Sequence, residues 1–209
     1  MPLEVFDAQR DIRNLFITPE IRSRIIRFKP GEVSHGHTHD LGHEMFVVLD
    51  GQAEFTIAGQ SAVLGPGQIC VARAGEWHEI RTLTDGPMTL YLSVTPHLEP
   101  THTQWDREGG ARLPYRYGGS TRTERTGAQV EPVRVLVDRH VQAAQSLATA
   151  AADYAVEQQR LAGQLSQPSD PAAARAVIDD MTAGFQRMYA ALQSAERAWN
   201  DLAPAVAGD

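Results

Sequence analysis

The chain has 209 residues, of which 42% are hydrophobic and 22% are charged, and its formal net charge is −7. These values are ordinary for a globular protein with one core and an extension. The acidic balance disfavours nucleic acid and anionic membrane surfaces as partners. Cys70 is the only cysteine, and no apolar run approaches the roughly 20 residues that span a bilayer. Since the start of the chain also lacks the basic and apolar regions of a secretory signal, we expect a cytoplasmic protein.

The segment from residue 20 to 97 has the pattern of a β-rich domain. Short runs with β-branched or aromatic residues recur there, separated by turns that contain Gly or Pro. The expected strands are 25–28, 44–49, 53–57, 61–64, 68–72, 78–83 and 88–95. Many short strands at this spacing predict an all-β sandwich or barrel. A parallel βαβ sheet is disfavoured because no long helical pattern interrupts the runs.

A histidine-rich segment lies between the first two of these runs. His37 and His39 are two positions apart, so an extended backbone places both side chains on one face. A turn at residues 40–42 would bring the carboxylate of Glu44 beside the two imidazoles. Imidazoles and one carboxylate, with coordination positions left open, suit a divalent transition metal that activates small molecules.

Residues 96 to 130 carry a weaker pattern. The stretch 101–126 is rich in Gly, Arg and Thr and contains Trp105, Tyr115 and Tyr117. We interpret it as an arm that partly packs back on the barrel. Its middle, residues 118–121, has the composition of a flexible linker.

The remainder of the chain has a helical pattern. Two series of residues alternate steps of four and three, the spacing of a helix–helix seam. The first is His140, Ala144, Leu147, Ala151, Tyr154, Gln158, Leu161 and Leu165, and the second is Ile178, Met181, Phe185, Met188, Leu192, Ala195, Trp199 and Leu202. Ser169 or Asp170 could cap the second helix, with Pro171 in its first turn.

These patterns predict three parts. Residues 1–118 form the β-barrel with its trailing arm, residues 119–135 a linker, and residues 136–209 an antiparallel helical hairpin. A two-helix hairpin buries little surface alone, so we expect it to pack on the barrel or on a second subunit. The expected assembly is a homodimer.

Two segments resemble the paired sequence motifs of the cupin superfamily, as found in small single-domain bacterial cupins. The first motif, G-x5-H-x-H-x4-E-x6-G, matches at Gly31, His37, His39, Glu44 and Gly51. The second, G-x5-P-x-G-x2-H-x3-N, matches at Gly67, Gly75 and His78, whereas Arg73 replaces its proline and Thr82 its asparagine. The resemblance covers roughly residues 20 to 97.

This resemblance implies an all-β double-stranded β-helix, the cupin jelly-roll barrel, with the site inside it. It also implies that His37, His39, Glu44 and His78 bind one divalent transition metal. Iron is the leading candidate, and manganese, nickel, zinc and cobalt are alternatives. Glu44 could stay a ligand or act as a catalytic base.

Substrate-binding residues are predicted from strand parity. Phe46 and Val48 share parity with Glu44 and should line the cavity floor. Arg24 could meet a substrate carboxylate or form a surface salt bridge. Tyr91 and Ser93 share one face of the last strand, and either that face or its neighbour lines the pocket.

Other histidines and aromatic residues have weaker roles in this prediction. We expect surface or supporting positions for His35 and His43. His97 and His102 are interpreted as structural, with a place at the barrel mouth as the alternative. Two roles are possible for the four aromatic residues of this region, an aromatic lid or core packing: Trp77, Trp105, Tyr115 and Tyr117.

Three functions are compatible with these residues. The leading hypothesis is a metal-dependent dioxygenase that acts on a small organic substrate. The same ligands would serve a non-oxidative isomerase, lyase or decarboxylase. The third is a small-molecule-binding or sensor protein without catalysis.

Overall fold

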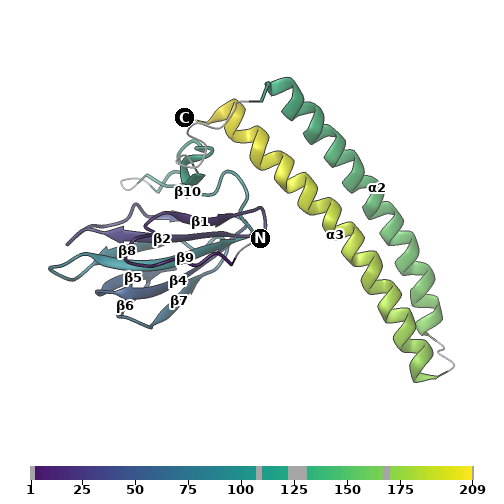
Figure 1. The fold of residues 1–209 in the computed structure, drawn as a ribbon, viewed down its shortest axis with the longest axis horizontal. Coiled ribbons are helices and arrows are strands. Elements are labelled where there is room, and N and C mark those ends of the chain that lie inside the picture. The colour runs from purple at the N-terminus through teal and green to yellow at the C-terminus, as the bar shows by residue number, and fades with distance from the viewer. Residues whose placement is uncertain (1–2, 107–109, 122–130, 167–169, 209) are drawn as a thin grey trace. The chain divides into compact units, whose positions relative to one another are not determined.

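The computed structural model describes residues 3–106, 110–121, 131–166 and 170–208, and every structural statement below concerns these residues (Figure 1). The chain divides into two compact units. The barrel unit is Met1–Gln129 with Ala203–Asp209, and the hairpin unit is Val130–Leu202. Among the described residues, no helix carries an apolar stretch long enough to cross a membrane.

Two five-stranded antiparallel sheets form the barrel unit. The first has the order β1-β2-β9-β4-β7, and the second has the order β10-β3-β8-β5-β6. The strands are β1 (Asn14–Ile17), β2 (Arg22–Phe28), β3 (His37–Thr38), β4 (His43–Asp50), β5 (Ala53–Ile57), β6 (Gln60–Leu64), β7 (Ile69–Ala72), β8 (His78–Thr82), β9 (Met88–Thr95) and β10 (Thr103–Gln104). A short 3-10 helix, η1 (Gly119–Thr121), follows the arm. Together with the two helices described below, these sheets confirm the predicted fold class.

The core lies between the inner faces of the two sheets. Residues paired across antiparallel strands point to the same face. In the first sheet Glu44 pairs with Val94 and Ala72, and Phe46 pairs with Leu92 and Cys70. The buried core consists of Phe28, Phe46, Val48, Ala53, Phe55, Leu64, Ala72, Ile80, Met88, Leu90 and Leu92. Glu44 therefore shares the face of a strand that is otherwise devoted to apolar packing.

Two long helices, α2 (Val133–Leu165) and α3 (Pro171–Ala207), lie side by side as the predicted hairpin (Figure 1). Asp170 caps α3, because its Oδ1 accepts a hydrogen bond of 2.8 Å from the backbone N–H of Ala173. Pro171 is the first helical residue, as predicted. The other cap candidate, Ser169, lies outside the described residues.

The seam between the helices follows both predicted series, except at four positions whose residues are exposed: Ala144, Ala151, Ile178 and Phe185. Ala143 and Ala150 are half-buried, whereas the predicted Ala144 and Ala151 are exposed. In α3, Gly184 is buried and the predicted Phe185 is 49% exposed, although its ring lies against that of Tyr154 on α2. The same exchange places Val177 rather than Ile178 toward the seam. At these four positions a neighbouring small or apolar residue is more buried, and the partner helix decides between the two.

Candidate metal centre

Three strands of the barrel unit bring four predicted ligands together. His37 on β3 pairs directly with His78 on β8. His39 follows β3 immediately, and Glu44 is the second residue of β4 in the opposite sheet. His39, Glu44 and His78 are buried, and His37 is partly buried. The predicted ligand set is therefore one spatial cluster.

The ligand atoms converge on one point. The Nε2 atoms of His39 and His78 each lie 2.9 Å from Glu44 Oε2, and the Nε2 atom of His37 lies 3.9 Å from it. All four ligand atoms are within 4.8 Å of one another. A cluster of three imidazole nitrogens and one carboxylate oxygen at this spacing could hold a metal ion.

Backbone carbonyls fix the orientation of all three imidazoles. The Nδ1 atoms of His37 and His78 donate to the carbonyls of His35, at 2.8 Å, and Glu76, at 3.0 Å. The Nδ1 atom of His39 donates to the carbonyl of Thr101. Because a carbonyl only accepts, a neutral ring held this way keeps its lone pair on Nε2. All three lone pairs then face the cluster.

This arrangement of acceptor atoms is stabilised by a bound cation and is unfavourable without one. Three Nε2 lone pairs and an ionised Glu44 are all acceptors, and acceptors at close range repel unless a proton or a metal ion lies between them. The buried Nε2 atom of His37 has no hydrogen-bond partner among the described residues. A buried polar atom without a partner costs free energy unless a ligand satisfies it.

The protonation states favour metal binding as well. Burial, together with the neighbouring His78 and His39, lowers the pKa of His37 from 6.5 to about 3. Burial alone would raise the pKa of Glu44, but without a metal ion, protons on the Nε2 atoms of His39 and His78 form hydrogen bonds with its carboxylate and hold that pKa well below 4.5. A metal ion would take the place of these protons. At neutral pH His37 is thus neutral and Glu44 is ionised, which are the forms that bind a divalent cation.

Comparison with known proteins identifies the barrel. Residues 24–95 match the sequence model of the cupin domain family. These residues form a cupin domain. The match ends at the last residue of β9, so the arm and the helices lie beyond it.

Several solved structures show similarity to part of this chain. One is an uncharacterized conserved protein with a double-stranded beta-helix domain from Klebsiella pneumoniae, with 21% identity over 46% of this chain and 91% of that chain and a TM-score of 0.43. Another is TT1209 from Thermus thermophilus, with 22% identity over 45% and 98% of the two chains and a TM-score of 0.43. A third is an oxalate oxidase, with 20% identity over 37% of this chain and 42% of that chain and a TM-score of 0.35. None of the curated proteins compared with this chain matches it.

The predicted cavity-floor residues lie on the inner face of the cupin domain. Phe46 and Val48 are both fully buried in the core, and the Phe46 ring centroid is 5.7 Å from that of His78. Arg24 pairs with Leu92, which places it on the same face as Phe46. Phe46 therefore forms an apolar wall beside the cluster, and Arg24 is a half-buried cation on the inner face.

Tyr91 and Ser93 are not brought to the cluster, because the neighbouring face of the last strand is the one that points inward. They pair with Val47 and Met45, on the face of β4 opposite to Glu44. The Tyr91 hydroxyl instead exchanges a hydrogen bond of 3.0 Å with Ser23 Oγ. The sequence carries a signal for this, because β9 alternates Met88, Leu90, Leu92 and Val94 with residues that bear hydroxyl groups, and an apolar face is expected to point to the core.

The remaining histidines occupy two kinds of position. His35 and His43 have exposed side chains, and the Nδ1 atom of His43 accepts a hydrogen bond from the backbone of Ala74. His97 is buried and lies 3.3 Å from the hydroxyl of Thr101 through its Nδ1 atom, in keeping with a structural role. His102 is different, because its ring contacts the rings of His37 and His39.

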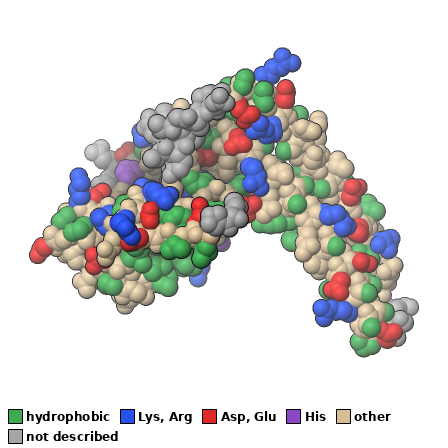
Figure 2. Space-filling view, in the orientation of Figure 1, with side chains coloured by type: hydrophobic (Ala, Val, Ile, Leu, Met, Phe, Trp, Pro, Cys, Tyr) green, Lys and Arg blue, Asp and Glu red, His purple; other side chains and the backbone are tan. Residues whose placement is uncertain are grey.

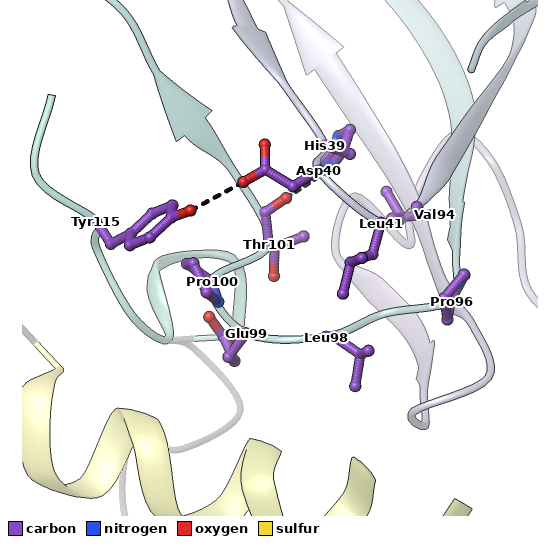
Figure 3. A pocket seen from close by; sticks show the side chains of 11 residues that line it. His39, Asp40, Leu41, Val94, Pro96, Leu98, Glu99, Pro100, Thr101 and Tyr115 are labelled. Carbon is purple, nitrogen blue, oxygen red and sulfur yellow. Dashed lines mark hydrogen bonds between the residues drawn. The ribbon is translucent and has the colours of Figure 1, made fainter. Parts of the chain in front are cut away.

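A cavity of about 270 Å³ borders the centre on the side of the arm (Figure 3). His39 and Val94 line it from the barrel, and Thr101 and Tyr115 line it from the arm. The Tyr115 hydroxyl donates a hydrogen bond of 2.9 Å to Asp40 at its edge. Only one of the four ligands lines this cavity, so it lies beside the metal centre and does not contain it.

Proposed function

We propose that the cupin domain is a metal-dependent oxidoreductase of the dioxygenase type that acts on a small organic substrate. The observation that supports this proposal is the convergence of three carbonyl-oriented Nε2 atoms and one buried carboxylate oxygen on a single point. Mixed nitrogen and oxygen ligands of this kind suit redox-active divalent metals.

His37, His39, Glu44 and His78 would hold the metal. An Fe(II) ion bound there would supply open coordination positions for a substrate and for dioxygen, and manganese, nickel, zinc or cobalt could occupy the same ligands. The carbonyls of His35, Thr101 and Glu76 keep the imidazoles oriented when the site is loaded.

Glu44 serves better as a ligand than as a base. An effective general base has a pKa near the working pH, whereas the pKa of Glu44 is well below 4.5. A carboxylate held ionised at neutral pH attracts a cation strongly and accepts a proton poorly.

The walls of the barrel would select the substrate. Phe46 offers an apolar surface next to His78 and excludes water from that side. Arg24, on the inner face, would attract a substrate that carries a carboxylate. A small, partly apolar organic acid satisfies both features.

Dioxygen uptake by protein reconstituted anaerobically with Fe(II) tests the proposal. We expect uptake with at least one member of a panel of thiols, catechols, flavonols and dicarbonyl compounds. His37→Ala should lower that uptake at least 100-fold, because it removes a ligand. The matched control is His43→Ala, since His43 is an exposed histidine outside the cluster.

Two results would contradict the proposal. One is an Fe(II)-loaded protein that consumes no dioxygen with any member of the panel. The other is turnover under strict anaerobiosis, which would indicate a non-oxidative isomerase or lyase that uses the same ligands.

A further inference from the structure

The arm adds a histidine to the ligand-bearing face of the second sheet. On β10, Thr103 pairs with Thr38 and Gln104 pairs with His37 in antiparallel register. One step further along the same register, His102 stands opposite His39. Since cross-strand neighbours share a face, His102 belongs to the face that carries the metal ligands.

Ring contacts support this placement. The ring centroid of His102 lies 4.5 Å from that of His37 and 4.9 Å from that of His39. His102 is nevertheless not one of the four residues whose ligand atoms lie within 4.8 Å of one another. It stands next to the ligand set without belonging to it.

Neighbouring residues of the arm hold His102 in position. Thr103 Oγ1 donates a hydrogen bond of 2.8 Å to Asp40, and Trp105 Nε1 donates one of 3.3 Å to Thr38. The carbonyl of Thr101 accepts from His39. The backbone on both sides of His102 is therefore tied to β3 and its turn, and ordering the imidazole costs little when a ligand arrives.

The His102 imidazole does not contribute a hydrogen bond that holds the arm on the barrel. No residue in the described part of the chain forms a hydrogen bond with the His102 ring. Its nitrogens stay available to a ligand, which an apolar side chain filling the same space would not offer. A histidine at this place is best explained by a partner that is present only when the site is loaded.

We propose that His102 is a ligand-binding residue of the metal centre, where it forms a hydrogen bond with a small anionic molecule bound to the metal. Arg22 and Arg24 lie on the inner face of the first sheet, in the cross-strand rows of Glu44 and Phe46, and their positive charge favours an anion. The inference rests on the proposed metal centre and does not depend on the dioxygenase reaction.

Azide binding to the cobalt-loaded full chain tests this role without turnover. Azide is a small anion that binds open positions on Co(II) and accepts a hydrogen bond. The visible spectrum of Co(II) reports the binding of the metal and the binding of azide to it. Two variants of similar size separate the possible roles of His102. His102→Gln keeps a hydrogen-bonding group, whereas His102→Leu fills the space without one.

We expect His102→Leu to keep its Co(II) affinity within about threefold and to weaken azide binding about tenfold, the effect of one hydrogen bond to a charged group. His102→Gln should recover most of that loss, and the control His43→Ala should bind azide as the unaltered chain does.

Other outcomes overturn the inference. Equal azide affinity in His102→Leu would mean that the ring only fills space, and the metal centre would stand. A loss of Co(II) affinity of tenfold or more in both variants would make His102 a metal ligand instead. If the unaltered chain bound no Co(II), the metal centre and the role of His102 would fall together.

Discussion

The barrel unit and the hairpin unit differ greatly in how many of their side chains are buried and held in place. In the barrel unit, eleven apolar residues form one buried cluster, and a buried carboxylate and two buried imidazoles adjoin it. In the described part of the hairpin unit, Leu136, Leu161, Gly184 and Ala198 are the buried residues, and Ile178 and Phe185 remain about half exposed. A sheet assigns every side chain to a face, whereas two helices bury only a narrow seam.

This difference explains where a precise site can form. The metal cluster needs four atoms within 4.8 Å, and such precision requires side chains supported on several sides. The hairpin has no comparable support, and Figure 2 shows acidic and basic side chains interspersed with apolar ones along it. Its half-exposed apolar residues are compatible with the expected homodimer, which stays a prediction.

The largest expected effect comes from the barrel core. Phe46 is 1% exposed, and its ring centroid lies 5.4 Å from that of Phe55. Phe46→Ala should lower the free energy of unfolding of the barrel by about 3–5 kcal/mol, because it leaves a cavity. Leu49→Ala, on the opposite face of β4 and 37% exposed, is the control and should cost less than about 1 kcal/mol.

Hydrogen–deuterium exchange resolved by peptide measures this effect in each unit. Peptides from β4 and β9 should lose protection in Phe46→Ala, and peptides from α2 should not. An equal loss in α2 would show that the two units unfold together, and the contrast between them would disappear.

Low pH should reduce the stability of the barrel, with an effect between those of the core substitution and the helix cap. His37 and His97 have pKa values of about 3 in the folded protein, in both cases chiefly because of burial, against 6.5 when unfolded. Below pH 6.5 the unfolded chain therefore binds more protons than the folded one. Stability is complete above pH 6.5 and is lost as the pH falls toward 3, by up to about 1.4 kcal/mol per pH unit for each histidine.

Urea unfolding of the metal-free protein between pH 7 and pH 4, in the presence of a chelator, measures this slope. Burial also lowers the pKa of His102 well below 6.5. His37→Gln removes one of these three groups and should reduce the slope, whatever it does to stability at pH 7. A slope that is the same in both proteins would show that His37 does not titrate in this way.

The smallest expected effect concerns the cap of α3. Asp170→Ala removes the acceptor for the N–H of Ala173 and should cost about 1 kcal/mol of hairpin stability. Asp180→Ala, an exposed position inside the same helix, should change it by less than about 0.5 kcal/mol. Thermal unfolding followed by circular dichroism at 222 nm compares the two variants. Equal losses would mean that the cap contributes nothing beyond its charge.

The sequence by itself determined the features that depend on local spacing. The parity of His37 and His39, the turn before Glu44 and the spacing to His78 identified all four members of the cluster. The steps of four and three identified both helices, and Asp170 with Pro171 marked the start of the second. Each of these signals lies within a short segment, where the geometry of a strand or a helix is fixed by the backbone alone.

The tertiary structure decided what depends on pairing between distant segments. Tyr91 and Ser93 face away from the cluster because the register of β9 against β4 pairs them with Val47 and Met45, on the face opposite to Glu44. Ala143 rather than Ala144 enters the helix seam because the partner helix decides between two adjacent alanines. His102 reaches the ligand face because β10 adds to β3 across more than sixty residues of chain. No local pattern specifies such a pairing, since its free energy comes from contacts that exist only once the barrel has closed.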